Sequence, residues 1–268
     1  MSAHGANLRV LAIDTSTEMC SAAVLLPGGK IVLRATLTER SHAELILPMI
    51  DEVLAEAGLK LRDLDGLAFG RGPGGFTGLR IAAGVVQGLA YGAGLKVAPV
   101  SSLAAVAYLT SPAGAGEVAL RAGERAFTSP AGAGEVDRRS GEGSGVLVCN
   151  DARMSELYWA CYRFDPAAPC VPIELSTERV GPAASVEPVS GVTRFAGNGI
   201  PRYPELRARL EAAGLRCHDG SYPRADAVAR LGAAMLARGE GVEPAEAVPT
   251  YVRDDVARPA GPPVTGMS

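Results

Sequence analysis

The sequence predicts an α/β protein with two lobes, each formed by a mixed sheet of five or fewer strands with helices on its faces. Two observations lead to this prediction. Short runs of branched apolar residues alternate with longer segments of helical periodicity. The second half of the chain then repeats the opening scheme of an apolar strand, a turn with an acidic residue and a second strand. The 268 residues, 47% of them hydrophobic, suffice for one large domain or two small lobes.

Charge and cysteine content narrow the classes of function. The net charge is −3 and the pI is near 5.7, whereas proteins that grip a phosphate backbone usually carry a basic surface. We therefore expect any role with nucleic acid to depend on a basic partner. Five cysteines without a C-x-x-C pair indicate free thiols in a reducing compartment. No stretch reaches the roughly 18 apolar residues of a membrane span, so we expect a cytoplasmic protein without a membrane role.

The first half begins with three predicted strands, at residues 8–14, 19–26 and 31–37. A Pro-Gly-Gly turn signal before the third strand favours an antiparallel meander. We predict further strands at 64–69 and 97–100 and helices at 77–91 and 101–109, with a glycine-rich loop at 70–78. Together with the helix described next, the order βββαβαβα is typical of the ribonuclease H-like lobe found in actin and the sugar kinases.

The first predicted helix follows the meander, and its apolar residues recur at every fourth position. Ser41 and Glu44 have the spacing of a capping box, and Gly58 marks the end of the helix. Pro48 interrupts the pattern because it lacks a backbone donor, which predicts either a kink near Glu44 or a helix that begins only at Leu47.

Residues 110–144 differ in composition from the rest of the chain. The motif TSPAGAGEV occurs at 110–118 and again at 128–136, and the segment holds few large apolar residues. Such a composition cannot bury enough surface to offset the entropy of ordering. We interpret the segment as a flexible surface insert that arose by local duplication, and a functional tail is the alternative.

The second half, residues 145–268, is predicted to form a smaller lobe than residues 1–109. Its first two strands, 145–150 and 155–162, flank the acid-bearing turn that repeats the scheme of the first lobe. We expect the last helix of the chain to pack back on the first lobe. The remaining predicted elements are strands at 172–180 and 193–196 and helices at 203–213 and 226–238.

Three residues at the end of the first strand, Asp14, Thr15 and Ser16, are candidates for a cofactor-binding phosphate turn. An acid can lie near a metal there, and hydroxyl and amide groups can bind phosphate. The same residue types are ordinary turn formers, so a structural turn is the alternative. The second lobe lacks a matching phosphate loop, and residues 197–199 are the only remnant of an adenosine site. An independent kinase is therefore disfavoured.

Other catalytic constellations are incomplete. Asp14 and Asp151 belong to different lobes, so the acidic cluster of a two-metal nuclease is missing. None of the three histidines lies four residues from another on a helix, which disfavours a zinc site. His42 stands beside Ser41, but neighbours on a helix do not face each other. We interpret Ser41 as a helix cap and His42 as a surface residue.

The glycine-rich segment GRGPGGFTGLRIAAGVVQGLAYG, residues 70–92, is the most unusual part of the sequence. Its loop could cradle an anion with help from Arg71 or Arg80, although it matches neither common phosphate-loop signature. Glycine within a helix costs up to about 1 kcal/mol relative to alanine, so the glycines of the helical part need a packing reason.

Three of these glycines, Gly84, Gly88 and Gly92, recur at every fourth position and would let another helix approach closely. We expect the larger residues of the same helix to pack on the sheet: Ile81, Val85 and Leu89. The first predicted helix adds a second apolar surface, formed by Leu47, Met49, Ile50 and Leu54. The two helices together indicate an interface for another subunit, and a contact with the other lobe is an equally open alternative.

Six segments carry a family resemblance: LAIDTSTEMCSAAVL, SHAELILPMIDEVLAEAGL, GRGPGGFTGLRIAAGVVQGLAYG, VSSLAAVAYL, DARMSELYWACY and VPTYVRDDVA. Together they resemble the bacterial TsaB (YeaZ) family of tRNA threonylcarbamoyladenosine biosynthesis proteins, once grouped with the glycoproteases. The match spans nearly the whole chain except the insert, and GPGGFTGLR is its most specific part.

The resemblance implies two actin-like ATPase lobes and a subunit with no catalytic residues, metal or cofactor of its own. It implies a heterodimer with the TsaD-type transferase, which modifies the adenosine beside the anticodon in tRNAs that read codons beginning with adenine. TsaD-like enzymes hold a metal with paired histidines, whereas here His42 is followed by Glu44 in place of a second histidine. A TsaE-type ATPase is expected in a larger complex, ATP or ADP at the junction with the partner, and contact with tRNA through the complex only.

The resemblance also places the partner contact on the first two helices, with homodimers through the same helices when the chain is alone. The interface residues that it implies are Leu47, Met49, Ile50, Val53, Arg80, Ala83, Gly84, Gln87, Gly88 and Tyr91. The alternative function is an ATP-dependent phosphotransferase or a peptidase of the actin-like superfamily that acts on its own.

Overall fold

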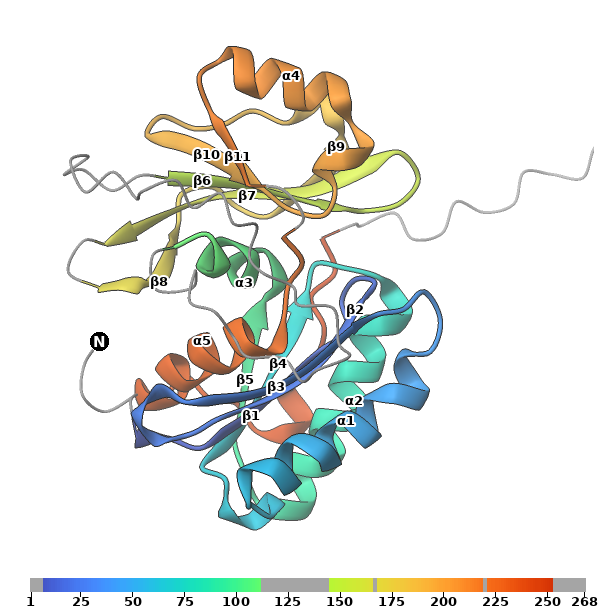
Figure 1. The fold of residues 1–268 in the computed structure, drawn as a ribbon, viewed down its shortest axis with the longest axis vertical. Helices are drawn as coiled ribbons and strands as arrows, with labels where there is room; N and C mark the ends of the chain where they lie inside the picture. The colour runs from blue at the N-terminus through green and yellow to red at the C-terminus, as the bar shows by residue number, and fades with distance from the viewer. Residues whose placement is uncertain (1–6, 112–144, 166–167, 219–220, 253–268) are drawn as a thin grey trace, which may run out of the picture.

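A computed structural model describes residues 7–111, 145–165, 168–218 and 221–252. Two sheets lie one above the other, with helices between them and on both outer sides (Figure 1). The segment interpreted as a flexible insert, 110–144, lies outside the described residues apart from its first two.

The first sheet has five strands in the order β3-β2-β1-β4-β5. The first three strands form the predicted antiparallel meander, and β1, β4 and β5 run parallel. Every residue of β1 and β2 is buried, because helices cover both faces of the sheet. The strands are β1 (Val10–Asp14), β2 (Met19–Leu25), β3 (Ile31–Leu37), β4 (Gly66–Gly72) and β5 (Val97–Ser101).

Helices α1 (His42–Ala57) and α2 (Phe76–Ala93) cover the outer face of the first sheet (Figure 1). Each helix turns an apolar stripe toward the sheet and ends at a glycine in the left-handed conformation, Gly58 for α1 and Gly94 for α2. Among the described residues, no helix is long and apolar enough to cross a membrane.

The structure excludes one of the two predicted alternatives for the start of α1. The helix begins at His42 rather than at Leu47, and Pro48 lies inside it. Ser41 occupies the N-cap position, but its side chain makes no capping hydrogen bond, so the predicted capping box with Glu44 is wrong. The reason is the backbone of Ser41, whose φ of −97° and ψ of 17° depart from the extended conformation that a capping side chain needs.

The orientation of α2 also differs from the prediction. Its sheet-facing side carries mostly small residues, and small side chains let the helix axis lie close to the sheet. The larger residues Ile81, Val85 and Leu89 are only half-buried, in the cluster that α1 and α2 share. The buried residues of α2 are Gly78, Leu79, Ala82, Ala83, Val86 and Ala90.

The second sheet has six strands, one more than the prediction allows. The predicted strand 172–180 is two strands that pair with different parts of β7, and between them the Ser176 hydroxyl accepts a hydrogen bond from the amide of Cys161. The short β11 is absent from the prediction, and α4 (Pro204–Ala212) covers the outer face. The strands are β6 (Gly145–Asp151), β7 (Glu156–Asp165), β8 (Ala168–Glu174), β9 (Arg179–Pro182), β10 (Val192–Ala196) and β11 (Arg216–His218).

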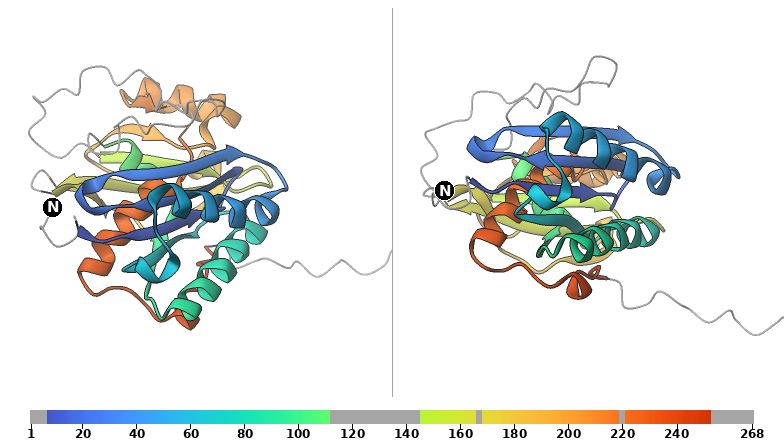
Figure 2. Two further views of the ribbon diagram at one scale, coloured as in Figure 1. Left: turned by 60° about the horizontal axis from the view of Figure 1, so that its bottom comes forward. Right: turned by 90° about the horizontal axis from the view of Figure 1, so that it is seen from below.

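Two helices between the sheets are exchanged between the halves of the chain (Figures 1 and 2). α3 (Ser102–Leu109) follows the first sheet in sequence. Its residues Leu103, Val106 and Ala107 pack against the second sheet, whereas Ala105, Tyr108 and Leu109 pack with the first sheet and α5. α5 (Ala225–Ala237) comes near the end of the chain and packs on the first sheet, where Gly232 lies against Ala68. The first sheet therefore buries a helix from the second half, and the second sheet buries one side of a helix from the first half. Single turns of 3₁₀ helix lie at Pro27–Gly29, Leu61–Asp63, Ala183–Ser185, Ile200–Arg202 and Pro244–Glu246.

Three cysteines illustrate the predicted thiol state. Cys20, Cys149 and Cys161 are buried thiols without a disulfide bond. Burial raises the pKa of Cys20 to about 12, and it raises the pKa of the other two as well. Because the thiolate is the reactive form, these side chains serve as small hydrophobic residues rather than as nucleophiles.

Candidate functional site

The turn after β1 holds the candidate phosphate-binding residues Asp14, Thr15 and Ser16, and all three are at most 1% exposed. Their polar atoms bind one another or the nearby backbone. The hydroxyl and the amide of Ser16 both donate to Oδ1 of Asp14, at 2.7 and 2.9 Å. The Thr15 hydroxyl donates to the carbonyl oxygen of Gly78 at 2.7 Å. Both hydroxyls are therefore already engaged as donors within the protein.

The glycine-rich loop packs directly on this turn. A Cβ atom at Gly78 would lie 1.9 Å from the carbonyl oxygen of Thr15, and one at Gly74 would lie 2.4 Å from that of Ser16. Real side chains do not approach so closely, so only glycine fits at these two positions. The loop therefore stabilises the turn, and the turn and the loop together line one side of a cavity of about 390 Å³.

The second carboxylate oxygen of Asp14 lies deeper in the protein. No described residue donates a hydrogen bond to this Oδ2 atom, and none pairs with the Ser102 hydroxyl at the start of α3. A Cβ atom at Gly70 would lie 1.9 Å from Oδ2. Burial raises the pKa of Asp14 to about 6, although the two hydrogen bonds from Ser16 offset part of this shift. The turn thus contains a buried acid that titrates near neutral pH.

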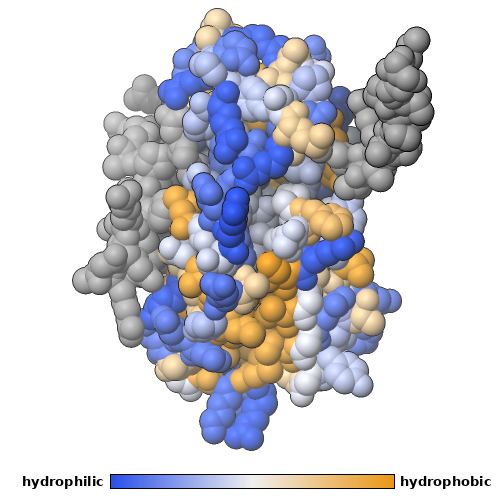
Figure 3. All heavy atoms as spheres, turned by 90° about the vertical axis from the view of Figure 1, so that its right-hand side faces the viewer, coloured by the Kyte–Doolittle hydropathy of each residue, from blue (hydrophilic) through white to orange (hydrophobic). Residues whose placement is uncertain are grey.

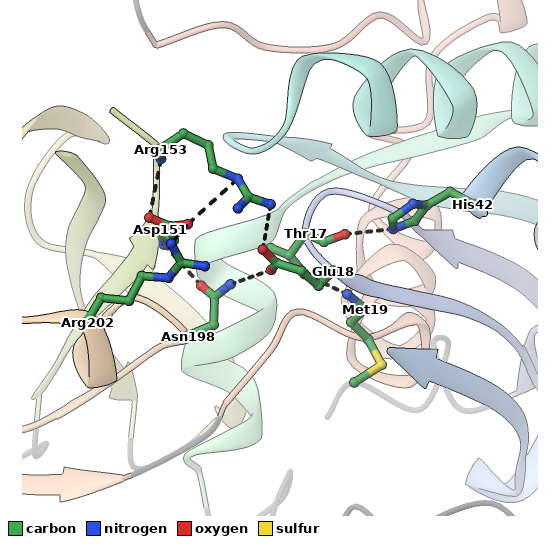
Figure 4. A network of polar contacts seen from close by, with 8 residues as sticks. All are labelled: Thr17, Glu18, Met19, His42, Asp151, Arg153, Asn198 and Arg202. Carbon is green, nitrogen blue, oxygen red and sulfur yellow. Dashed lines mark hydrogen bonds and ion pairs between the residues drawn. The ribbon is translucent and has the colours of Figure 1, made fainter. Parts of the chain in front are cut away.

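The two lobes face each other across a cleft with two adjoining cavities of about 390 and 350 Å³. Figure 4 shows the polar contacts that span this cleft. Glu18, in the turn after β1, accepts hydrogen bonds from Arg153 at 2.6 Å and from Asn198 at 3.2 Å. Asn198 also accepts one from the amide of Asp151 at 3.1 Å. One acid of the first lobe therefore joins two segments of the second.

Acids neutralise the cations on the second lobe's side of the cleft. Arg153 and Arg202 lie 3.7 and 3.5 Å from Oδ2 of Asp151. Residues 153–155 have φ values of 62°, 51° and 60°, a left-handed conformation that costs energy outside glycine, and the ion pairs of Arg153 hold this turn in place. Three arginines line the second cavity, and among them only Arg40 has no ion pair with a described residue.

A second set of contacts joins the lobes near the candidate anion ligand Arg71. This side chain pairs with Glu178 of the second lobe at 3.3 Å. Glu178 also accepts a hydrogen bond from Ser101, the N-cap residue of α3, whose hydroxyl lies 3.4 Å from that of Tyr162. Arg71 is therefore engaged in holding the lobes together, and sequence reasoning missed these partners because they lie far apart in the chain.

His42 differs from its predicted role as a surface residue. Its ring is buried, and Nε2 donates to the carbonyl oxygen of Thr17 at 2.8 Å, which ties the start of α1 to the turn after β1 (Figure 4). The ring faces the turn because α1 begins at this residue. Within the described residues, no group of three or more His, Cys, Asp or Glu side chains is arranged to hold a metal ion.

The outer face of α1 and α2 is the second candidate site, and Figure 3 shows hydrophobic residues gathered over the first lobe on the side where these helices lie. Leu47 is 50% exposed and Tyr91 is 84% exposed. Gly84 and Gly88 are exposed, and a Cβ atom at either position would meet nothing within 4 Å. The alternative that these glycines contact the other lobe is therefore wrong for the part of that lobe that the structure describes.

Not all ten interface residues implied by the resemblance lie on this face. Ile50, Val53 and Ala83 are buried in the core beneath it, because they belong to the stripes that α1 and α2 turn toward the sheet. Met49 is half-buried, and Gln87 donates a hydrogen bond to the carbonyl oxygen of Ala247. The exposed members are Leu47, Arg80, Gly84, Gly88 and Tyr91.

Comparison with known proteins identifies relatives over most of the chain. The model of the family TsaD, tRNA N6-adenosine threonylcarbamoyltransferase, matches residues 34–126. The tRNA threonylcarbamoyladenosine biosynthesis protein TsaB of Escherichia coli (strain K12) is 34% identical over 260 residues, which cover 93% of this chain and 96% of that protein. The protein of the same name from Haemophilus influenzae is 57% identical over 101 residues, and this match spans 38% of this chain and 42% of that protein.

Solved structures agree with the sequence comparison. YeaZ from Pseudomonas aeruginosa is 34% identical, with a TM-score of 0.70 over 91% of this chain and 99% of that one. A second structure, described as an uncharacterized protein with similarity to peptidase YEAZ from Pseudomonas aeruginosa, is also 34% identical. Its TM-score is 0.71 over 92% of this chain and 100% of that one. Both likenesses cover the two lobes together.

Proposed function

Because the chain belongs to the TsaB family of tRNA threonylcarbamoyladenosine biosynthesis proteins, we propose that it is the non-catalytic partner that binds and activates a TsaD-type transferase. The modified nucleoside is N6-threonylcarbamoyladenosine, in tRNAs that read codons beginning with adenine. The chain reaches tRNA only through the complex, since its net charge of −3 does not favour a phosphate backbone.

The observation that carries this proposal is the outer face of α1 and α2. Gly84 and Gly88 cost helix stability, yet no described residue of the chain occupies the space above them. Leu47 and Tyr91 expose apolar surface beside them. A partner that packs on this face explains both features, because small residues admit a close helix and exposed apolar side chains gain from burial.

A non-catalytic role is supported by the turn after β1, whose hydroxyl groups donate hydrogen bonds within the protein. The hydroxyls of Thr15 and Ser16 are bound within the protein, and the paired arginines of the cleft neutralise acids of the same chain. The alternative is a phosphotransferase or peptidase that acts on its own. That alternative needs a set of free catalytic groups in the cleft, whereas Glu18, Arg153 and Asn198 there are engaged in contacts between the two lobes.

The proposal extends to the other members of the assembly. A TsaE-type ATPase joins the complex, and ATP or ADP binds at the junction with the transferase rather than in the cleft of this chain. In the absence of the transferase, the face of α1 and α2 is covered by a second copy of this chain, which forms a homodimer. We place the whole assembly in the cytoplasm.

Size exclusion with light scattering tests the central part of the proposal. The chain is mixed with the TsaD-type protein of its own organism, with and without ATP, and the mass of the complex is measured. In a second sample Gly84 and Gly88 are both changed to Leu. Because both positions are open, this variant should fold, and leucine favours a helix more than glycine does by roughly 0.8 kcal/mol per residue.

The matched control changes Ala208→Leu and Ala212→Leu, two exposed small residues with the same spacing on α4 of the second lobe. We expect a one-to-one complex with the unaltered chain and the control, and at least a tenfold loss of affinity with the glycine variant. Failure of the unaltered chain to bind, together with ATP hydrolysis by the chain alone, would favour the phosphotransferase alternative.

A further inference from the structure

The last described segment, residues 241–252, runs back along α2, and we call it the strap. At its start Val242 and Val97 exchange two main-chain hydrogen bonds, of 2.8 and 3.0 Å. In its middle Ala247 is fully buried, and its carbonyl oxygen accepts a hydrogen bond from Gln87 of α2 at 3.2 Å. The strap is therefore fixed to the sheet and to the helix.

The strap ends beside the first turn of α2. The amide of Thr250 donates to the carbonyl oxygen of Arg71 at 2.8 Å. The ring of the next residue, Tyr251, lies 5.6 Å from the ring of Phe76, between centroids. Arg80 connects the two rings, since its guanidinium carbon lies 3.8 Å from the centre of the Phe76 ring and its Nε donates to the Tyr251 hydroxyl at 3.1 Å.

Although its backbone is fixed, the strap leaves apolar side chains on the surface. Val248 is 55% exposed and Tyr251 is 42% exposed, and Phe76 beside them is 45% exposed. With Leu47 of α1 and Tyr91 of α2 they make up five of the eight large hydrophobic residues that are exposed in the described part of the chain. Such a concentration marks an interaction surface rather than scattered surface residues.

Arg80 gives this surface a charge. The rings of Phe76 and Tyr251 fix the orientation of the Arg80 side chain, yet no described residue forms an ion pair with it. Arginine and aromatic side chains dominate the energetics of protein interfaces. A side chain that is already held in place loses less entropy on binding. A cation in apolar surroundings favours a partner with the opposite charge at the same point.

We propose that the strap belongs to the partner surface and that Arg80 meets a carboxylate within an apolar patch of the TsaD-type partner. In this arrangement Val248 and Tyr251 enlarge the partner surface beyond α2, on the side of α2 opposite to α1. The inference rests on the proposed function, and it adds the chemistry by which the partner is recognised.

The dissociation constant of the full chain with the TsaD-type protein tests this inference, measured by calorimetry at low and high salt. Arg80→Ala and Val248→Ser should each weaken binding by about tenfold, and Arg80→Ala should also reduce the dependence on salt. Arg80→Lys should retain part of the affinity because it keeps the charge. The matched controls are Arg163→Ala and Leu175→Ser, exposed residues of the second lobe, and they should change the constant less than twofold.

Each outcome decides the inference, and melting temperatures show whether a variant has folded. If the unaltered chain binds and both Arg80→Ala and Val248→Ser bind equally well at unchanged melting temperature, the inference is overturned and the proposed function stands. If the unaltered chain does not bind, the proposed function itself fails. If the two variants weaken only the homodimer, seen by light scattering, the occupant is a second copy and the assignment of the partner is overturned.

Discussion

In the glycine-rich segment, Gly70 and Gly78 are enclosed by other parts of the chain, whereas Gly84 and Gly88 face outward. A Cβ atom at Gly70 or Gly78 would lie 1.9 Å from an oxygen atom of the turn after β1. Cβ atoms at Gly84 and Gly88 would meet nothing within 4 Å. The first pair is explained by the fold of a single chain. The fold of the described chain does not explain why Gly84 and Gly88 are glycines, so we attribute them to contact with a partner.

The largest effect is expected at the enclosed glycines. Gly78→Ala would place a Cβ atom against the carbonyl oxygen of Thr15, and two backbone segments must then move apart. We expect the free energy of unfolding to fall by about 3–5 kcal/mol, measured by urea denaturation. A loss below about 1 kcal/mol would contradict the close packing of the loop on the turn.

An intermediate effect is expected at Asp14, whose Oδ2 atom faces Gly70. Burial raises the pKa of Asp14 from 3.8 to about 6, so the folded state holds the proton more tightly than the unfolded state. The carboxyl group therefore costs no stability below about pH 4, and its cost grows as the pH rises to about 6, where it reaches about 2–3 kcal/mol.

Asp14→Asn removes this titration. The difference in free energy of unfolding between the variant and the unaltered chain, measured in urea at intervals from about pH 4 to 7, should shift in favour of the variant as the pH rises. The comparison at each pH cancels the contributions of the other acids. A difference that stays constant across this range would show that Asp14 is not a buried charge beneath the loop.

The smallest effect is expected at the outward-facing glycines. Gly84→Ala and Gly88→Ala should each raise the stability of the chain alone by about 0.5–1 kcal/mol, because alanine favours the helix and nothing blocks its methyl group. Thermal unfolding of the single chain measures this change. A loss of stability would reveal an internal contact at these positions, and it would remove the contrast with the loop.

Much of the first lobe could be predicted from local patterns. Apolar runs, turn residues and Gly58 mark the elements from β1 to α3 because these signals act over a few residues. In the second lobe β8 and β9 have no glycine or proline turn between them, so the pattern predicts one strand where the chain forms two. The length of β11, three residues, leaves no periodicity to detect.

The last helix was expected to pack back on the first lobe, whereas the packing of α3 on the second sheet could not be predicted, because it is a property of the tertiary fold. The same holds for the contacts of Glu18 and Arg153, which lie 135 positions apart. Periodicity identified the outer helices but not their rotation, so Ile50 was expected on the outer surface and is found in the core. Val53, which the resemblance places at the interface, is also in the core. The signal for the exposed stripe was instead the spacing of the glycines, since an unexplained loss of helix propensity points to packing.

Hydrogen–deuterium exchange of the chain, alone and with its TsaD-type partner, tests the central claim most directly. We expect slower exchange in α1, α2 and the strap when the partner is present. No change is expected in α4, whose outer surface is charged and carries the ion pair between Arg207 and Glu211. Protection confined to α4 or to the turns of the cleft, with none in α2, would contradict the account.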